Sequence, residues 1–202
     1  MTLLYTHPSG YSHATPPGHP EQVARLDAVL GALDGLDLIR RDAPDADDAD
    51  ILRGHPAAYL ERLDRKTPDQ GWSMLDSDTH LSPGSLTAAR HAVGGVCAAV
   101  DAVLAGEAAN AFVAMRPPGH HAERARAMGF CLFSNVALGA LRALDHHGLD
   151  RVAVLDFDVH HGNGTQDLLW DEGRAMFAST HQAPLYPGTG AASERGAHGQ
   201  IV

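Results

Sequence analysis

Two short stretches of the sequence concentrate side chains that bind metals and move protons. One reads DFDVHHGNG and carries Asp156, Asp158, His160 and Asn163, and the other reads RPPGHHA and carries the pair His120–His121. Carboxylate and imidazole groups suit a divalent transition metal, and a catalytic zinc typically keeps one position open for water or substrate. A metal-bound water is a nucleophile near neutral pH, but hydrolysis also requires a base and an acid. These residue types therefore predict a metal-assisted hydrolytic site.

The residues divide naturally between metal binding and proton transfer. Asp158 and His160 could bind one ion together, and the two histidines of RPPGHHA could share the work of base and acid. An imidazole in that work needs a fixed tautomer, which a carboxylate or an amide at its second nitrogen provides. Asp156 and Asn163 are therefore candidate partners of the histidine pair.

The element before the first cluster is expected to be a strand. If the segment from Val152 to His160 is extended, every second side chain leaves on the same face, which places Asp156, Asp158 and His160 together. Gly162 and Gly164 would end the strand, and Thr165 would cap the next helix. The carboxyl end of a strand is where open α/β sheets place their active sites.

The histidine pair follows another apolar strand, Ala111–Met115, that is stopped by Pro117–Pro118. Neighbouring strand ends would bring the two clusters together. Alternating strands and helices predict an α/β fold with a mostly parallel sheet and helices on both faces. The other expected elements are strands at 3–5 and 175–180, helices at 20–35, 55–63, 85–105 and 134–148, an acidic linker at 43–52 with Asp50 as a possible cap, and the start of a strand at 200–202.

Composition bounds the class of protein. A chain of 202 residues that is 44% hydrophobic predicts one globular domain, and a net charge of -10 argues against nucleic-acid binding and allows a cationic partner. Two cysteines outside any CxxC spacing indicate a reducing compartment. No apolar run is long enough to span a membrane and no signal peptide is recognisable, so a cytoplasmic location is expected.

Simpler interpretations stand beside these. A histidine pair in a loop can be merely solvated, Gly129–Phe130 can be a turn and a core aromatic, and Ser179–His181 can be a plain strand end. A thiol nucleophile has weak support, because Cys97 lies in an expected helix and Cys131 suits a small buried hydrophobe. The remaining histidines are expected to be structural or solvated, those of the loop after the first strand being solvated.

The motifs together resemble the zinc-dependent histone deacetylase family, particularly its class II and bacterial members, which include acetylpolyamine amidohydrolases and acetoin-utilisation proteins. The resemblance rests on five motifs in the family's order, which are HPEQVAR (19–25), RPPGHHA (116–122), GFCLFSN (129–135), DFDVHHGNGTQ (156–166) and STHQAPLYPGTG (179–190). It implies an arginase-like three-layer α/β fold and removal of acetyl groups from acetyl-lysine, acetylated polyamines or other small amines. An acetylated amine is the implied partner, and an oligomer is possible.

The resemblance also implies roles for individual residues. Asp158 and His160 match zinc ligands, and the histidine pair matches a tandem acid/base pair whose partners correspond to Asp156 and Asn163. The implied substrate and potassium residues are Gly129 and Phe130 in the wall of the acyl-lysine tunnel, Arg25 near the exit channel for acetate, and Asp156, Asp158, His160, Ser179 and Thr180 around a structural potassium ion.

Two expected features of the family have no match in the sequence. The second aspartate ligand and the tyrosine or histidine that polarises the acetyl carbonyl are both missing, so residues 1–202 are interpreted as the N-terminal part of a single domain, incomplete at its C-terminal side. The alternative is therefore an inactive truncated fragment that acts, if at all, by association or ligand binding. An arginase-type ureohydrolase is disfavoured, because its two-metal site needs further Asp and His ligands.

Overall fold

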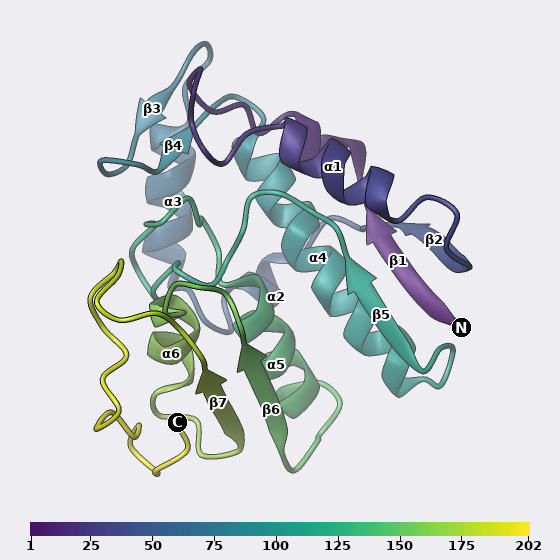
Figure 1. Cartoon of the computed structure of the whole chain (residues 1–202), viewed down its shortest axis with the longest axis vertical. Coiled ribbons are helices and arrows are strands. Elements are labelled where there is room, and N and C mark those ends of the chain that lie inside the picture. Colours follow the sequence, from purple (N-terminus) through teal and green to yellow (C-terminus); the bar gives the residue numbers. More distant parts are fainter.

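The computed structural model describes all 202 residues, and it contains two small parallel sheets with helices packed against them (Figure 1). The strands are β1 (Thr2–Thr6), β2 (Leu38–Asp42), β3 (Ser73–Met74), β4 (His80–Leu81), β5 (Asn110–Val113), β6 (Val152–Asp156) and β7 (Ala175–Ser179). The helices are α1 (Ala24–Ala32), α2 (Asp48–Ile51), α3 (Ala57–Lys66), α4 (Ser85–Leu104), α5 (Asn135–Asp145) and α6 (Asn163–Leu169), with a 3-10 turn η1 (Pro8–Tyr11). No helix combines the length and the hydropathy needed to cross a membrane.

The first sheet has the order β2-β1-β5, with every pair parallel. Its central strand is apolar and buried on both faces: Leu4 packs with Leu26 of α1, and Leu3 packs with Ala99 of α4. Parallel sheets are normally covered in this way, because helical crossovers place helices on the faces. The expected α/β fold with a mostly parallel sheet is therefore confirmed.

The second sheet consists of β6 and β7, in parallel register with Val154 opposite Phe177. Both of these side chains belong to the main core with α5 and α6. The other face of β6 is open, since Leu155 is 70% exposed and Phe157 is 88% exposed. Strand β6 is therefore covered by the core on one face only, although most of its residues are apolar. A parallel bridge from Phe177 to Ile201 confirms the beginning of a strand near the C-terminal residue.

Helix α4 packs against β1 and β5 of the first sheet and against α5, which in turn packs on β6, so it joins the two halves of the molecule (Figure 1). Its glycine pair explains how closely it packs. A Cβ atom on Gly94 would lie 2.1 Å from the carbonyl oxygen of Pro44, and one on Gly95 would lie 2.9 Å from the Cβ of Ala43. Gly94 and Gly95 therefore allow close packing of α4 against the segment that contains Ala43 and Pro44.

Several local expectations were wrong. Helix α1 begins at Ala24 and not at Pro20, because the backbone at Glu21 bonds the ring of His19. Only Leu26 of its apolar residues is buried. Asp50 does not cap a helix; it lies within α2 and binds Arg142.

Other errors concern the loops. Thr165 lies inside α6, whose N-cap position is Gly162. His13 is buried and not solvated, because its Nδ1 atom lies 2.7 Å from Oγ of Ser85. β2 and the β3–β4 hairpin were not predicted, because β2 is polar and the hairpin strands have only two residues each, too few for an apolar alternation.

Candidate functional site

The structure brings the two polar stretches together where β5 and β6 end. The histidine pair lies in the loop between β5 and α5, and the second stretch joins β6 to α6. The ring centroids of His120 and His121 are 3.9 Å apart. Residues more than 30 positions apart in sequence thus form one site.

His120 has a carboxylate partner. Its Nδ1 atom lies 2.9 Å from Oδ2 of Asp156, whose other oxygen accepts a hydrogen bond from the backbone N–H of Asp158. Burial alone would raise the pKa of Asp156, but the hydrogen bond and charge of His120, together with the hydrogen bond from the backbone of Asp158, outweigh burial and lower the pKa. A Cβ atom on Gly162 would lie 2.2 Å from Oδ2, so a residue without a side chain is required beside this carboxylate.

His121 has an amide partner. Its Nδ1 atom lies 2.8 Å from Oδ1 of Asn163, and the Nδ2 group of Asn163 donates to Oε1 of Glu123. Because that donation identifies Oδ1 as the acceptor, the imidazole carries its proton on Nδ1 and leaves Nε2 free to accept one. Burial and the neighbouring His120 lower the pKa of His121 to about 4. His121 is therefore a neutral imidazole at neutral pH.

Asp158 and His160 form the candidate metal-binding pair. Strand β6 ends at Asp156, so the two residues lie in a turn and not in a continued strand as expected. Oδ1 of Asp158 lies 3.1 Å from Nδ1 of His160. Two ligands about 2.1 Å from a tetrahedral zinc ion are roughly 3.4 Å apart, so this spacing fits two ligands of one ion. No group of three His, Cys, Asp or Glu side chains is arranged to hold a metal, so Asp158 and His160 are the only candidate ligands.

One cavity of about 640 Å³ connects these groups with the expected substrate residues. Its walls include both histidines of the pair and the candidate metal ligands. Gly129, Phe130 and Arg25, expected to contact substrate, also line it. Asp156 and Asn163 do not line the cavity. They hydrogen-bond the Nδ1 atoms of His120 and His121.

Gly129 is required by close approach to the histidine pair. Its φ is 55°, and a Cβ atom there would lie 2.4 Å from Cδ2 of His121. Phe130, with φ of 69°, is the only non-glycine residue with positive φ, and its backbone N–H donates to Oγ1 of Thr79. The backbone strain of this residue is a feature typical of functional sites.

Tyr186 and Asp78, which also line the cavity, were not predicted from the sequence. Tyr186 lies with its ring centroid 5.0 Å from that of His121, and Asp78 lines the same cavity. Burial, together with the charges of Asp78 and Asp76, raises the pKa of Tyr186. The only sequence signal for Tyr186 was its place in the motif STHQAPLYPGTG, and Asp78 lay in a segment interpreted as a plain loop.

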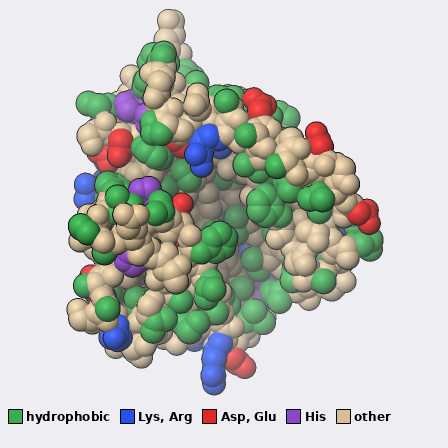
Figure 2. All heavy atoms as spheres, viewed as in Figure 1, with side chains coloured by type: hydrophobic (Ala, Val, Ile, Leu, Met, Phe, Trp, Pro, Cys, Tyr) green, Lys and Arg blue, Asp and Glu red, His purple; other side chains and the backbone are tan.

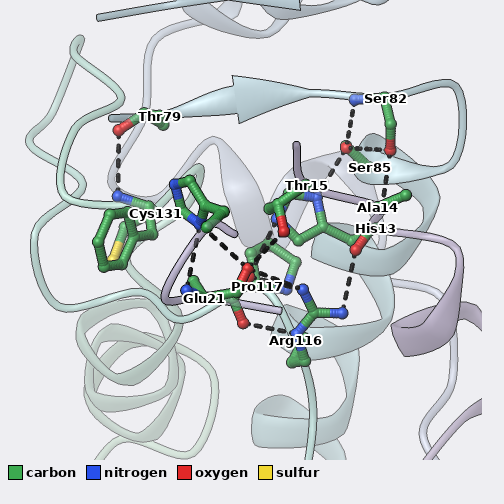
Figure 3. Close-up of polar contacts among 12 residues, drawn as sticks. His13, Ala14, Thr15, Glu21, Thr79, Ser82, Ser85, Arg116, Pro117 and Cys131 are labelled. Atoms are coloured by element: carbon green, nitrogen blue, oxygen red, sulfur yellow. Dashed lines mark hydrogen bonds and ion pairs between the residues drawn. The ribbon is translucent and has the colours of Figure 1, made fainter. Parts of the chain in front are cut away.

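A buried ion pair anchors the loop of the histidine pair. The guanidinium of Arg116 donates through Nε and Nη2 to the two carboxylate oxygens of Glu21, at 2.5 and 2.6 Å (Figure 3). The same group donates to the carbonyl oxygens of Gly10 and His13. Burial raises the pKa of Glu21, but the bonds from His13 and Arg116 outweigh burial and lower it to about 2. Glu21 is therefore ionised at neutral pH, and both residues line the cavity.

The remaining candidates lie outside the cavity. Ser179 and Thr180, expected near a potassium ion, line a different cavity beside His181, although the N–H of Thr180 donates to the carbonyl of Asp156. Both cysteines are free and buried, and burial raises the pKa of Cys97 to about 12 and that of Cys131 further. A thiol nucleophile is therefore not supported.

Comparison with known proteins gives consistent results. The sequence profile of the histone deacetylase domain matches residues 19–201. A histone deacetylase-like amidohydrolase of Pseudomonas aeruginosa is 46% identical over 180 residues, which are 89% of this chain and 47% of that protein. A probable deacetylase of Archaeoglobus fulgidus is 36% identical over 97% of this chain and 55% of its own length. An uncharacterized protein of Synechocystis is 46% identical over 94% of this chain and 64% of its own length.

The fold comparison points the same way. The crystal structure of the HDA15 HD domain superimposes with a TM-score of 0.93 at 31% identity, covering 99% of this chain and 62% of that domain. The chain therefore spans about half to two thirds of the length of these relatives.

Proposed function

Because this chain belongs to the histone deacetylase family, whose arginase-like fold it shares, we propose that it supplies the acid/base half of a metal-dependent deacetylase site. The substrate would be an acetylated amine, either acetyl-lysine in a protein or an acetylated polyamine or other small amine. The products would be the free amine and acetate. We also propose a cytoplasmic location and, at the loop that joins β6 to α6, a structural potassium ion near Asp156, Asp158, His160, Ser179 and Thr180.

Zinc is the cofactor that we propose, and its ligands in this chain would be Asp158 and His160. Their 3.1 Å separation and their carboxylate and imidazole chemistry support this assignment. When bound, zinc polarises a carbonyl group and lowers the pKa of a bound water. A further ligand would have to come from outside these residues.

The histidine pair would carry the protons. His121 is neutral at neutral pH, and its Nδ1–H is held by Asn163, so its Nε2 atom can accept a proton from the attacking water. His120 is held at Nδ1 by Asp156 and would act as the acid that protonates the leaving amine. Asp156 and Asn163 would act as positioning residues, because they set the tautomer and orientation of the rings.

The cavity would bind the acyl-amine chain beside these groups. Gly129 allows the wall to approach His121 closely, and the rings of Phe130 and Tyr186 provide apolar surface. Arg25 lies on the same cavity wall, where its guanidinium could bind the departing acetate.

The observation that carries this proposal is the pair of adjacent histidines, each with its own fixed Nδ1 partner, in one cavity with the Asp158–His160 pair. The alternative of an inactive fragment is not favoured by the family match. The test is acetate release from an acetyl-lysine peptide and from an acetylated polyamine. The protein would be stripped of metal with a chelator and then reloaded with zinc. Zinc-dependent release supports the proposal, and release that chelation does not change contradicts it.

A further inference from the structure

One carboxylate beside the site has no part in the proposed function. Glu123 lies in the loop between β5 and α5, two residues after His121, and its side chain is half-buried. Its Oε1 atom accepts a hydrogen bond of 2.8 Å from Nδ2 of Asn163, the amide that holds His121. Neither Arg124 nor Arg126 pairs with it, so the amide is its one side-chain partner. Glu123, Asn163 and His121 therefore form a chain of hydrogen bonds.

The amide at the centre of this chain has two possible orientations. A half-turn about its terminal bond exchanges the positions of Oδ1 and Nδ2 with little change of shape. With Oδ1 toward His121, the imidazole must donate, so its proton is on Nδ1 and Nε2 is free to accept one. With Nδ2 toward His121, the imidazole must accept at Nδ1, so its proton is on Nε2. Only the first orientation gives the base that the proposed function requires.

Glu123 distinguishes between these orientations, because an ionised carboxylate accepts hydrogen bonds and cannot donate them. In the observed orientation Nδ2 of Asn163 donates to it. In the reversed orientation Oδ1 would face Oε1, with no hydrogen between the two acceptors, and a charge-assisted hydrogen bond would be lost. Asn163 is 6% exposed, so water has little access to replace that bond. The carboxylate therefore disfavours the orientation that would place the ring proton on Nε2.

A second acceptor acts in the same sense. Sδ of Met128 lies 3.4 Å from Nδ2 of Asn163, so each hydrogen of the amide group has an acceptor, and neither acceptor is His121. A thioether is a weak acceptor, whereas hydrogen bonds to an ionised group are the strong ones. Glu123 is therefore the main determinant of the amide orientation, and Met128 assists it.

The turn that carries Glu123 is fixed to the elements around the site. The backbone N–H of Glu123 donates to the carbonyl oxygen of Arg126 at 2.9 Å and closes a four-residue turn. Within the turn, the N–H of Arg124 donates to Oδ2 of Asp167 on α6 at 2.7 Å, and the carbonyl oxygen of Arg124 accepts from Nδ1 of His55. The amide is the side chain of the first residue of α6. Carboxylate and amide are thus attached to the same helix, which keeps them in register.

We propose that Glu123 is a positioning residue, which keeps the oxygen of the Asn163 amide toward His121 and thereby keeps the ring proton of His121 on Nδ1. The inference rests on the proposed function only for its catalytic consequence, a base at Nε2. The choice of tautomer is a property of this chain and can be measured without metal or substrate.

The test is the isosteric variant Glu123→Gln, followed by ring ¹⁵N chemical shifts of the metal-free chain at neutral pH. A glutamine amide can donate as well as accept, so both orientations of the Asn163 amide would be satisfied although shape and hydrogen bonding are kept. We expect the ratio of the Nδ1–H to the Nε2–H tautomer of His121 to fall about tenfold or more, because a hydrogen bond to a charged group is worth at least that factor.

A surface carboxylate provides the control for the loss of one negative charge. Acidic side chains lie scattered over the face of the molecule that Figure 2 shows. Glu61 on α3 has a side chain that is 68% exposed. Glu61→Gln should leave the tautomer ratio of His121 unchanged.

A second variant exchanges the two groups. In Glu123→Gln/Asn163→Asp the amide is at position 123 and the carboxylate is at position 163, and a carboxylate cannot donate to His121 in either orientation. The double variant should therefore restore the Nδ1–H tautomer that Glu123→Gln loses. A merely structural role of Glu123 does not predict this recovery, because two substitutions at packed positions would then add their effects.

Two results would overturn the proposal. One is a Glu123→Gln variant that keeps the tautomer ratio of the unaltered chain, and the other is a double variant in which the Nε2–H tautomer persists. Neither readout depends on catalysis, so a failure here is distinguishable from a failure of the proposed deacetylase activity.

Discussion

The Nδ1 atom of His121 lies 2.8 Å from Oδ1 of Asn163, so an amide and not a carboxylate holds the more deeply buried ring of the pair. An amide fixes the tautomer without adding a negative charge that would favour imidazolium. The adjacent ring of His120, by contrast, faces the carboxylate of Asp156. The two neighbouring imidazoles therefore have different electrostatic surroundings, as an acid and a base of one reaction require.

The first prediction concerns the titration of His121. Its ring should stay neutral, with the proton on Nδ1, until the pH falls to about 4. Asn163→Ala removes the acceptor, so the Nδ1–H tautomer should lose population and the pKa should fall further. Ring ¹⁵N chemical shifts of metal-free protein report both quantities, with His147 on the surface as the internal control. Protonation of His121 near pH 6.5 would show that its site is not as described.

The second prediction concerns acid stability and His55. Its Nε2 atom accepts the backbone N–H of Ser134 and its Nδ1 donates to the carbonyl of Arg124, so the buried ring must be neutral. Burial lowers its pKa from 6.5 to about 4. Between pH 6.5 and about 4, His55 therefore binds a proton in the unfolded chain but not in the folded chain. The folded state loses stability as the pH falls through this range.

This effect should amount to about 2 kcal/mol between pH 7 and pH 5. His55→Gln should reduce the pH dependence of the free energy of urea unfolding by that amount, while His198→Gln, at an exposed position, should leave it unchanged. An unchanged slope in His55→Gln would refute the assignment.

Much of the site could be predicted from the sequence because the chemistry lies at strand ends. β5 and β6 are short apolar runs ended by proline or glycine, and the residues that follow them meet in space. The partners of the histidine pair could be anticipated because a carboxylate or an amide can fix an imidazole tautomer, and Asp156 and Asn163 lie close to the expected strand end.

The rest depended on tertiary contacts that no local pattern reports. The buried Glu21–Arg116 pair joins segments 95 residues apart, and ionised residues carry no hydrophobic periodicity. Asp78 and Tyr186 were missed because both lie in irregular loops. The exposure of Phe157 could not be foreseen, because an apolar strand residue gives no indication of which face of the sheet remains open.

The third prediction concerns this buried ion pair. Glu21→Gln leaves the Arg116 guanidinium buried without a counter-charge, which should cost about 3–5 kcal/mol of unfolding free energy. The double variant Glu21→Gln/Arg116→Gln should lose clearly less than the sum of the single variants, because neither partner is left charged and alone. Urea unfolding of the four proteins forms the cycle. Single losses below about 1 kcal/mol that simply add would contradict the description of a buried, coupled pair.

The fourth prediction uses two helical glycines as a matched pair. Gly94→Ala places a methyl group 2.1 Å from the backbone oxygen of Pro44 and should destabilise the protein by roughly 1–3 kcal/mol. Gly31→Ala, in α1 with open space around it, should stabilise it by about 0.5–1 kcal/mol. Thermal unfolding followed by circular dichroism shows whether each substitution lowers or raises the stability of the protein. Equal effects of the two substitutions would mean that α4 does not pack against the Pro44 segment as the structure has it.

The most direct test of the central claim is the rate of acetate release by the zinc-loaded 202-residue chain and its variants. His121→Ala removes the proposed base and Asp158→Ala removes a proposed zinc ligand. Each should lower the rate at least a hundredfold, the scale of general acid–base catalysis, while His147→Ala should retain it. Asp158→Ala should also reduce bound zinc, and His121→Ala should not. Undiminished turnover in both variants, or equal bound zinc in Asp158→Ala and the unaltered chain, would contradict the account.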